Sequence, residues 1–169
     1  HTRDIRRLGG LRKLMPITFM IASLAALSMA GIPLLNGFLS KEMMLEEANH
    51  TVLFNSPWLV PALATFGSIF SAAYCFRLIG HVFLGPVRQD YPAKPHDPGA
   101  GLWMPPAILV VLVVVIGVAP FLAEPFVKLV TASVLGGEAE MPKAYFKIWH
   151  GLVPALYMSI VAIVGGLIM

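Results

Sequence analysis

The chain has 169 residues, of which 57% are hydrophobic and 12% are charged, and its mean hydropathy is +0.78. Because soluble globular proteins carry about 25% charged residues, this composition leaves too little polar surface for a soluble particle of this size. It also excludes a disordered chain, a coiled coil, a collagen and a small secreted disulfide-rich domain. The composition therefore predicts a protein whose solvent is partly lipid.

The charge pattern and the cysteine content exclude further classes of function. The net charge is +3, but the basic residues lie in short runs beside apolar segments and no motif that reads DNA or RNA is present, so we expect no nucleic acid partner. Cys75 is the only cysteine, which excludes an intrachain disulfide and a thiol metal site. The sequence contains no Walker loop, dinucleotide fingerprint or metal-ligand spacing. We therefore expect no cofactor, no bound metal and no soluble catalytic site.

The first residues, HTRDIRRLGG, are polar and basic and lack the apolar core of a signal peptide. Because the chain also begins with His1, we interpret it as a piece of a longer polypeptide. The basic residues of this segment are expected to anchor the topology on one side of a membrane.

Four apolar stretches follow in chain order. Each reaches the roughly 20 residues that a helix needs to cross a ~30 Å hydrocarbon core. They cover residues 14–39, 58–84, 103–126 and 148–169. The segments between them contain proline, glycine and charged residues, so we expect loops at LEEANHTVLFNSP, GPVRQDYPAKPHDPGAG and TASVLGGEAEMPK. The sequence thus predicts an all-α integral membrane fold with four transmembrane helices.

The distribution of lysine and arginine predicts the orientation of these helices. If residues 1–13 face the cytoplasm, eight basic residues lie on that side, namely Arg3, Arg6, Arg7, Arg12, Lys13, Arg77, Arg88 and Lys94. Four lie on the opposite side, namely Lys41, Lys128, Lys143 and Lys147. Cytoplasmic loops carry an excess of lysine and arginine, so the pattern favours a cytoplasmic N-terminal end.

The first apolar stretch is too long for one straight helix. No polar loop interrupts residues 14–48, and a continuous helix of that length would measure about 50 Å. Proline removes a backbone donor and glycine relaxes the backbone, so a break at Gly31, Pro33, Asn36 and Gly37 would resolve the mismatch. The sequence therefore predicts that the first transmembrane helix is discontinuous.

Lys41 comes about one turn after this break, which would place its ammonium inside the membrane. A lysine there costs roughly 2.5 to 3.5 kcal/mol unless it faces a partner or a hydrated cavity. Burial disfavours the charged form, so such a lysine can load and release a proton near neutral pH, as a proton relay requires. The neighbouring Glu42 could oppose this by stabilising the charged form. The alternative is that the two residues mark a helix end whose lysine reaches the interface, and that Pro33 is a harmless kink.

Two residues of the second stretch are weaker candidates. Arg77 and His81 are four apart and share one helix face near its cytoplasmic end. The alternative is that Arg77 extends to the lipid headgroups. Glu124, at the end of the third stretch, is expected to cap a helix or to lie at the interface rather than to bind an ion.

Three segments resemble a known membrane family. HTRDIRRLGGLRKLMPIT, ALSMAGIPLLNGFLSKEMML and AAYCFRLIGHVFLG are similar to the C-terminal part of the proton-conducting subunits shared by Mrp-type cation/proton antiporters and complex I. The resemblance implies a broken helix whose lysine ends a central chain of membrane lysines and histidines, and Lys41 is the matching residue. The block LSMAGIPLLNGFLSKE is its most specific part and supplies the supporting candidates Gly31, Pro33, Asn36, Gly37, Ser40 and Glu42. The last stretch, which begins KIWHGL, is similar to the large A subunit of Mrp antiporters.

The resemblance implies that residues 1–169 are a C-terminal fragment of the A subunit of a monovalent cation/proton antiporter in a bacterial plasma membrane. Such a protein is a secondary transporter subunit rather than an enzyme, and it exchanges protons for Na⁺ or another monovalent cation. Its expected partners are the other subunits of a hetero-oligomeric complex and membrane lipid. One alternative is a proton-pumping subunit of NADH:quinone oxidoreductase or of a related hydrogenase. Another is a structural membrane subunit in which Lys41 only anchors a helix end.

Overall fold

The computed structural model describes residues 5, 8–87, 91, 93–136 and 153–169. Six α-helices make up most of this part: α1 Pro16–Ala30, α2 Asn36–His50, α3 Leu59–Leu78, α4 Ala100–Val118, α5 Glu124–Leu135 and α6 Pro154–Ile168. A π-helix at Ile79–Leu84 extends α3, and short 3₁₀ turns cover Leu11–Lys13 and Pro120–Leu122. An isolated bridge between Leu53 and Ser56 is the extent of β-structure in these residues. The predicted all-α fold is therefore confirmed.

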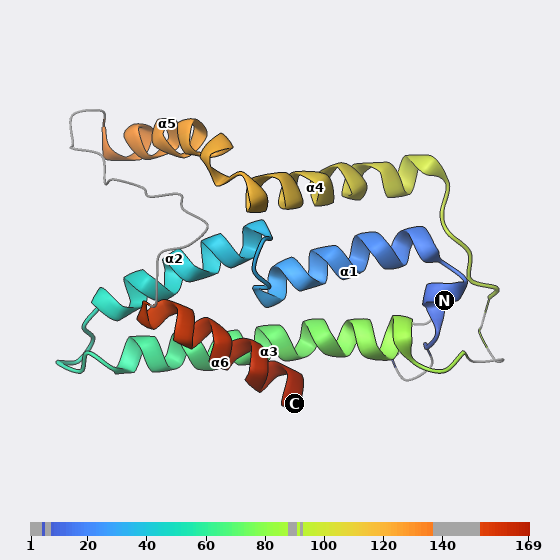
Figure 1. Ribbon diagram of the computed structural model, residues 1–169, viewed down its shortest axis with the longest axis horizontal. Coiled ribbons are helices and arrows are strands. Elements are labelled where there is room, and N and C mark those ends of the chain that lie inside the picture. The colour runs from blue at the N-terminus through green and yellow to red at the C-terminus, as the bar shows by residue number, and fades with distance from the viewer. Residues whose placement is uncertain (1–4, 6–7, 88–90, 92, 137–152) are drawn as a thin grey trace.

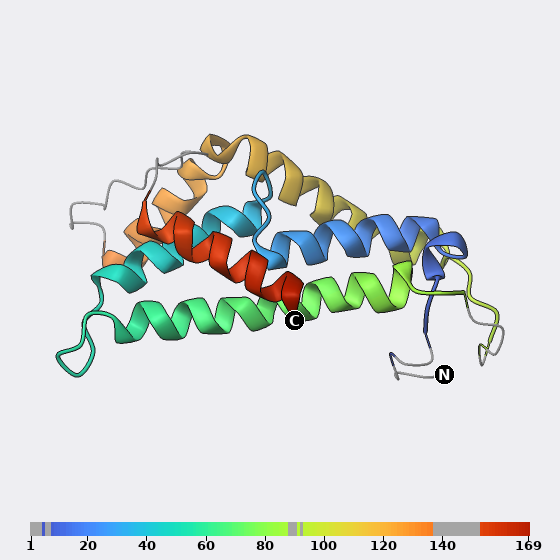
Figure 2. The same cartoon turned by 60° about the horizontal axis from the view of Figure 1, so that its bottom comes forward.

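The helices lie side by side as an elongated bundle (Figure 1). α1 and α2 follow one another in the same direction, and α3 returns beside them. α4 lies along the other side of α1 and α2, and α6 packs on α3 and α2. The short loop that separates α1 from α2 lies near the middle of the molecule in two views (Figures 1 and 2).

Small residues let these helices approach closely. The buried cluster between α1 and α3 consists of Ala26, Ala30, Ala72 and Cys75. At the contact of α3 with α6, a Cβ atom added to Gly166 would lie 2.6 Å from the Cβ of Ala72. Small residues at helix contacts are typical of membrane proteins, in which packing rather than water exclusion holds helices together.

The helices differ in whether they can cross a membrane alone. Two are long and apolar enough, namely Leu59–Leu84 with 26 residues and Ala100–Val118 with 19. Few of their residues are buried within the described part, whereas the core helix of a soluble protein is mostly buried. Pro16–Ala30 and Pro154–Ile168 are apolar but shorter.

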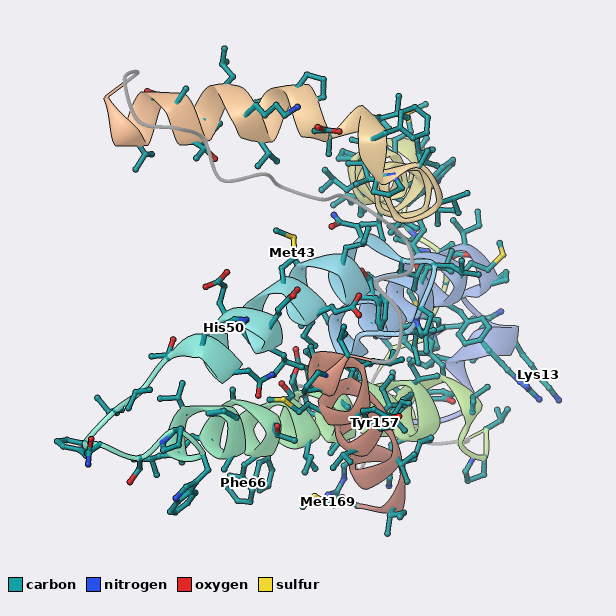
Figure 3. The ribbon with its side chains drawn as sticks, turned by 60° about the vertical axis from the view of Figure 1, so that its left-hand side comes forward. Lys13, Met43, His50, Phe66, Tyr157 and Met169 are labelled. Atoms are coloured by element: carbon teal, nitrogen blue, oxygen red, sulfur yellow. The ribbon has the colours of Figure 1, made fainter. Side chains whose placement is uncertain are left out.

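The third apolar stretch differs from the sequence prediction. It was expected to run from Trp103 to Phe126, but α4 begins at Ala100 and ends at Val118. Figure 3 looks nearly along α4 while α5 is seen from the side, so the chain turns between them. Pro120 and Pro125 explain the turn, because proline cannot donate a helical hydrogen bond.

Two expected loops are also partly helical. α5 continues to Leu135 and so includes the first residues of TASVLGGEAEMPK. α2 continues to His50 and so includes the first residues of LEEANHTVLFNSP. Both predictions were wrong at these ends because charged and small polar residues tolerate a helix until a glycine or an extended residue stops it, here Gly136 and Thr51.

A distant side chain caps the start of α1. Met15 offers no capping side chain, but the Asp97 carboxylate accepts hydrogen bonds from the Ile17 amide at 3.1 Å, the Thr18 amide at 3.0 Å and the Thr18 hydroxyl at 2.8 Å. Partial desolvation raises the pKa of Asp97, but the bonds from Thr18 and Ile17, together with nearby His96, outweigh it and hold the pKa below the usual 3.8. Asp97 therefore ties the segment before α4 to the first turn of α1.

Replacing Asp97 with alanine is expected to lower the Tm of the purified protein complex, because two α1 amides lose their acceptor. A carboxyl with a depressed folded-state pKa stabilises the fold above its unfolded value and loses this effect only as the pH falls through the folded one. The decrease should therefore be the same from mildly alkaline to mildly acidic pH. Glu47→Ala, on the exposed surface of α2, is the matched control. Equal Tm values for the two variants would contradict the cap.

Candidate functional site

The break between α1 and α2 is made by the backbone of residues 31–35. Gly31 adopts a left-handed conformation (φ 88°, ψ 35°), and its amide donates to the Ser28 carbonyl at 3.0 Å. The Ile32 amide donates to the Leu27 carbonyl at 3.1 Å, which completes a glycine-terminated C-cap. Pro33 follows and cannot continue the helix.

The second half of the break contains an unusual residue. Leu34 has a φ of 71°, a conformation that bulky side chains adopt rarely. A Cβ atom added to Gly117 of α4 would lie 2.4 Å from the Leu34 carbonyl oxygen and 2.6 Å from the Leu35 Cα. The end of α4 therefore lies directly against the break, and Gly117 makes this approach possible.

Two residues assigned to the break belong to α2 instead. Asn36 and Gly37 are the first two residues of that helix, so the break ends at Leu35. Gly37 lets α2 approach α1 closely. Its amide donates to the Ser28 hydroxyl at 3.0 Å, and an added Cβ would lie 2.0 Å from the Ser28 carbonyl oxygen. The first turn of α2 thus touches the last turn of α1.

The Lys41 side chain reaches from α2 across the break to the end of α1. Its Nζ donates to the Met29 carbonyl at 2.9 Å and to the Ala30 carbonyl at 3.2 Å. The last carbonyls of a helix lack intrahelical partners and carry partial negative charge, so an ammonium is favourable there. A Cβ atom on Gly31 would lie 3.0 Å from the Lys41 Cδ, so the glycine also leaves room for the lysine stem.

An open cleft of about 310 Å³ lies beside the lysine. It is lined by Ser28, Met29, Gly37, Ser40, Lys41 and Met44. The Ser40 hydroxyl is exposed and donates to the Gly37 carbonyl at 3.3 Å. From α3, the Ser71 hydroxyl donates to the Met29 carbonyl at 3.5 Å. The ammonium therefore contacts two carbonyls, and one hydroxyl lines the cleft beside it while another donates to the same Met29 carbonyl.

Glu42 is turned into the protein. The residue is 3% exposed, and the next buried residue on α2, Leu45, is fully buried. In Figure 3, Met43 lies on the side of α2 away from α6. Neighbouring helical residues point in different directions, so Lys41 reaches α1 while Glu42 is enclosed. Its tuning of the lysine stays a prediction.

The weaker candidates lie outside the break. Arg77 and His81 are both exposed, and the His81 Nδ1 lies 3.2 Å from the Arg77 carbonyl oxygen. The backbone there changes from α-helix to π-helix at Ile79, a change that is frequent at functional sites. Glu124 starts α5 and pairs with Lys128, as expected for a residue at a helix end. In the part of the chain that the structure describes, no three His, Cys, Asp or Glu side chains gather as metal ligands would.

Residues 1–71 match the family described as NADH:quinone oxidoreductase/Mrp antiporter, transmembrane. This segment is therefore similar to a membrane family. The match includes the break and Lys41, so the family resemblance predicted from the sequence is confirmed.

Known antiporter subunits and a solved Mrp complex extend the similarity to nearly the whole chain. A probable K⁺/H⁺ antiporter A/B subunit of Rhizobium meliloti is 44% identical over 168 residues, which are 98% of this chain and 17% of that protein. The A1 subunit of a Na⁺/H⁺ antiporter of Staphylococcus saprophyticus is 37% identical over 99% of this chain and 22% of its own length. The Mrp complex from a Dietzia species has a chain with a TM-score of 0.76 and 34% identity, which covers 95% of this chain and 17% of that one. The chain thus spans about a fifth of the length of its curated relatives.

Proposed function

We propose that the chain forms part of a membrane subunit of a monovalent cation/proton antiporter, in which Lys41 transfers protons at the break between α1 and α2. The subunit lies in the bacterial plasma membrane and works within a hetero-oligomeric complex, as a secondary transporter rather than an enzyme. One observation carries the proposal: the Lys41 ammonium donates across the break to the last carbonyls of α1, beside an open cleft. The relatives described as K⁺/H⁺ and Na⁺/H⁺ antiporter subunits support the choice of ions.

The position of Lys41 favours a relay over an anchor. A lysine that anchors a helix end extends toward the headgroups, away from the protein. Lys41 instead turns back to the carbonyls of Met29 and Ala30, at the point where the two helices meet. Gly31 and Pro33 end α1 there, Gly37 brings α2 close to it, and Ser40 adds a hydroxyl to the cleft.

We further propose that α1 and α2 together cross the membrane as one discontinuous span among four. α1 has 15 residues and is about 22 Å long, which is too short for a ~30 Å hydrocarbon core. Continued by α2 in the same direction, it is long enough. The remaining spans are α3 with its π-helical extension, α4, and α6.

Cysteine labelling tests this topology in a complex that carries Cys75→Ser. Lys13→Cys lies directly before α1, and Lys94→Cys lies in the segment before α4. Phe54→Cys, 85% exposed as phenylalanine, lies in the loop between α2 and α3. The starts of α1 and α4 are at one end of the bundle and the α2–α3 loop is at the other (Figure 1). We expect a membrane-impermeant thiol reagent to label the first two from the cytoplasm alone and the third from outside alone. Labelling of all three from one side would contradict four spans.

Ion exchange distinguishes the antiporter from the NADH-driven alternative. In everted vesicles of a strain without its own antiporters, we expect the assembled complex to release lumenal protons when Na⁺ or K⁺ is added, as reported by a pH-sensitive dye. The related oxidoreductases would instead acidify the lumen on addition of NADH. A complex that responds to NADH but to neither cation would contradict the antiporter.

A further inference from the structure

The carbonyl ends that hold the Lys41 ammonium have the chemistry of a cation site. We propose that the Met29 and Ala30 carbonyls bind a monovalent cation once Lys41 has released its proton, so that ammonium and cation occupy the same place in turn. The inference rests on the proposed function and adds to it where the exchanged cation binds.

The geometry already contains a cation at this position. The Lys41 Nζ lies 2.9 Å from one carbonyl oxygen and 3.2 Å from the other, and both belong to the last two residues of α1. Half-helix C-terminal ends carry partial negative charge, and discontinuous membrane helices coordinate Na⁺ with such carbonyls. An ammonium and a metal cation therefore compete for the same two oxygens.

The cleft supplies room and further oxygens. Its volume is about 310 Å³, against about 30 Å³ for one water molecule in the liquid, so a partly hydrated cation fits. The Ser40 hydroxyl lines the cleft, and the Ser71 hydroxyl lies 3.5 Å from the Met29 carbonyl oxygen. These groups can complete a shell of neutral oxygen ligands.

The residues that line the cleft favour a monovalent cation over a divalent one. Its residues are Ser28, Met29, Gly37, Ser40, Lys41 and Met44, none of which has a carboxylate. Ca²⁺ sites in proteins are rich in carboxylates and Mg²⁺ sites usually include one or two, so neither ion finds its usual ligands here. A monovalent cation needs less compensating charge.

The net charge at the site stays the same if one cation binds for each proton that Lys41 releases. Loss of the Lys41 proton to water in the cleft removes one positive charge, and the arriving cation restores it. The titratable groups near the lysine are Tyr74 and Cys75 of α3 and the enclosed Glu42 of its own helix, while α1 and α4 contribute none. The competition therefore depends chiefly on Lys41 itself.

Two substitutions should change cation binding in opposite ways. We would measure equilibrium binding of radioactive sodium, and separately of radioactive rubidium as a K⁺ substitute, to the purified complex across pH. In the wild type, binding at this site should rise with pH as the ammonium loses its proton. Lys41→Met leaves the carbonyls free, so binding should be as strong at acidic as at alkaline pH. Lys41→Arg keeps a fixed charge at the carbonyls and should lose this binding at every pH.

Lys128→Met, on α5 and outside the cleft, is the matched control and should keep the wild-type profile. Wild-type binding profiles for both Lys41 variants would overturn the cation site. If Lys41→Met fails to assemble, unchanged binding in Lys41→Arg still overturns it. Loss of exchange in these variants with unchanged binding would reject the cation site while leaving the proton relay in place, whereas full exchange in Lys41→Arg would reject the relay itself.

Discussion

Replacing Lys41 with alanine is expected to abolish cation/proton exchange in everted vesicles while the complex still inserts and assembles. The alanine cannot carry a proton and no longer donates to the Met29 and Ala30 carbonyls. Assembly should persist, because a methyl group removes the cost of a lysine inside the membrane. The measurement is the initial rate of proton release on addition of Na⁺ or K⁺, normalised to the amount of complex.

Lys41→Arg makes this result specific for proton transfer. Arginine can still donate to the end of α1, so a purely anchoring role would tolerate it. Its guanidinium keeps its charge at any accessible pH, so a relay would fail or nearly fail. Lys128→Arg, on exposed α5, should exchange normally. Full activity in Lys41→Arg would favour the structural role, in which Lys41 anchors a helix end.

Gly37→Ala is expected to have the largest effect on the geometry of the break. The new Cβ would lie 2.0 Å from a backbone oxygen of Ser28, so α2 must move away from α1. Overpacking of this kind typically costs about 1–3 kcal/mol. The shift would also separate Lys41 from the α1 carbonyls, so we expect both a lower Tm and a strong loss of exchange.

Gly67→Ala is the matched control for this substitution. Gly67 lies within α3, and an added Cβ would meet no atom within 4 Å. Alanine is favoured over glycine inside a helix by roughly 0.5–1 kcal/mol, so the control should be neutral or slightly stabilising. A Gly37→Ala variant that behaves like the control would mean that α1 and α2 do not approach as described.

Local chemistry was enough to predict that a helix ends near Gly31, but not where the next helix begins. Gly31 and Pro33 end a helix by their own properties, wherever the rest of the chain lies. Leu34 takes a left-handed conformation that its side chain does not favour, so no local rule places the end of the break at Leu35. The contact with Gly117 of α4 accompanies that conformation. A glycine within a run of valines was the available signal for such an approach.

The candidate site could likewise be predicted only in part from the sequence. Lys41 could be singled out because a lysine inside an apolar stretch needs a partner. The partners themselves are backbone carbonyls, which have no signature in a sequence. Asp97 was missed for a similar reason, since 79 and 80 residues separate it from the amides that it caps. The turn after α4 was also missed, although Pro120 and Pro125 were a signal for it in the sequence.

The central claim is that the Lys41 amine changes its protonation state during exchange, and chemical replacement of that amine tests it most directly. Lys41→Cys, in a complex whose other cysteines are replaced, including Cys75→Ser, should be inactive. Alkylation with bromoethylamine through the open cleft then rebuilds a side chain of nearly the same length whose amine is a weaker base than lysine. We predict that exchange returns and that its pH profile moves to lower pH. Restored exchange with an unshifted profile, or an active Lys41→Cys before alkylation, would contradict proton transfer by Lys41.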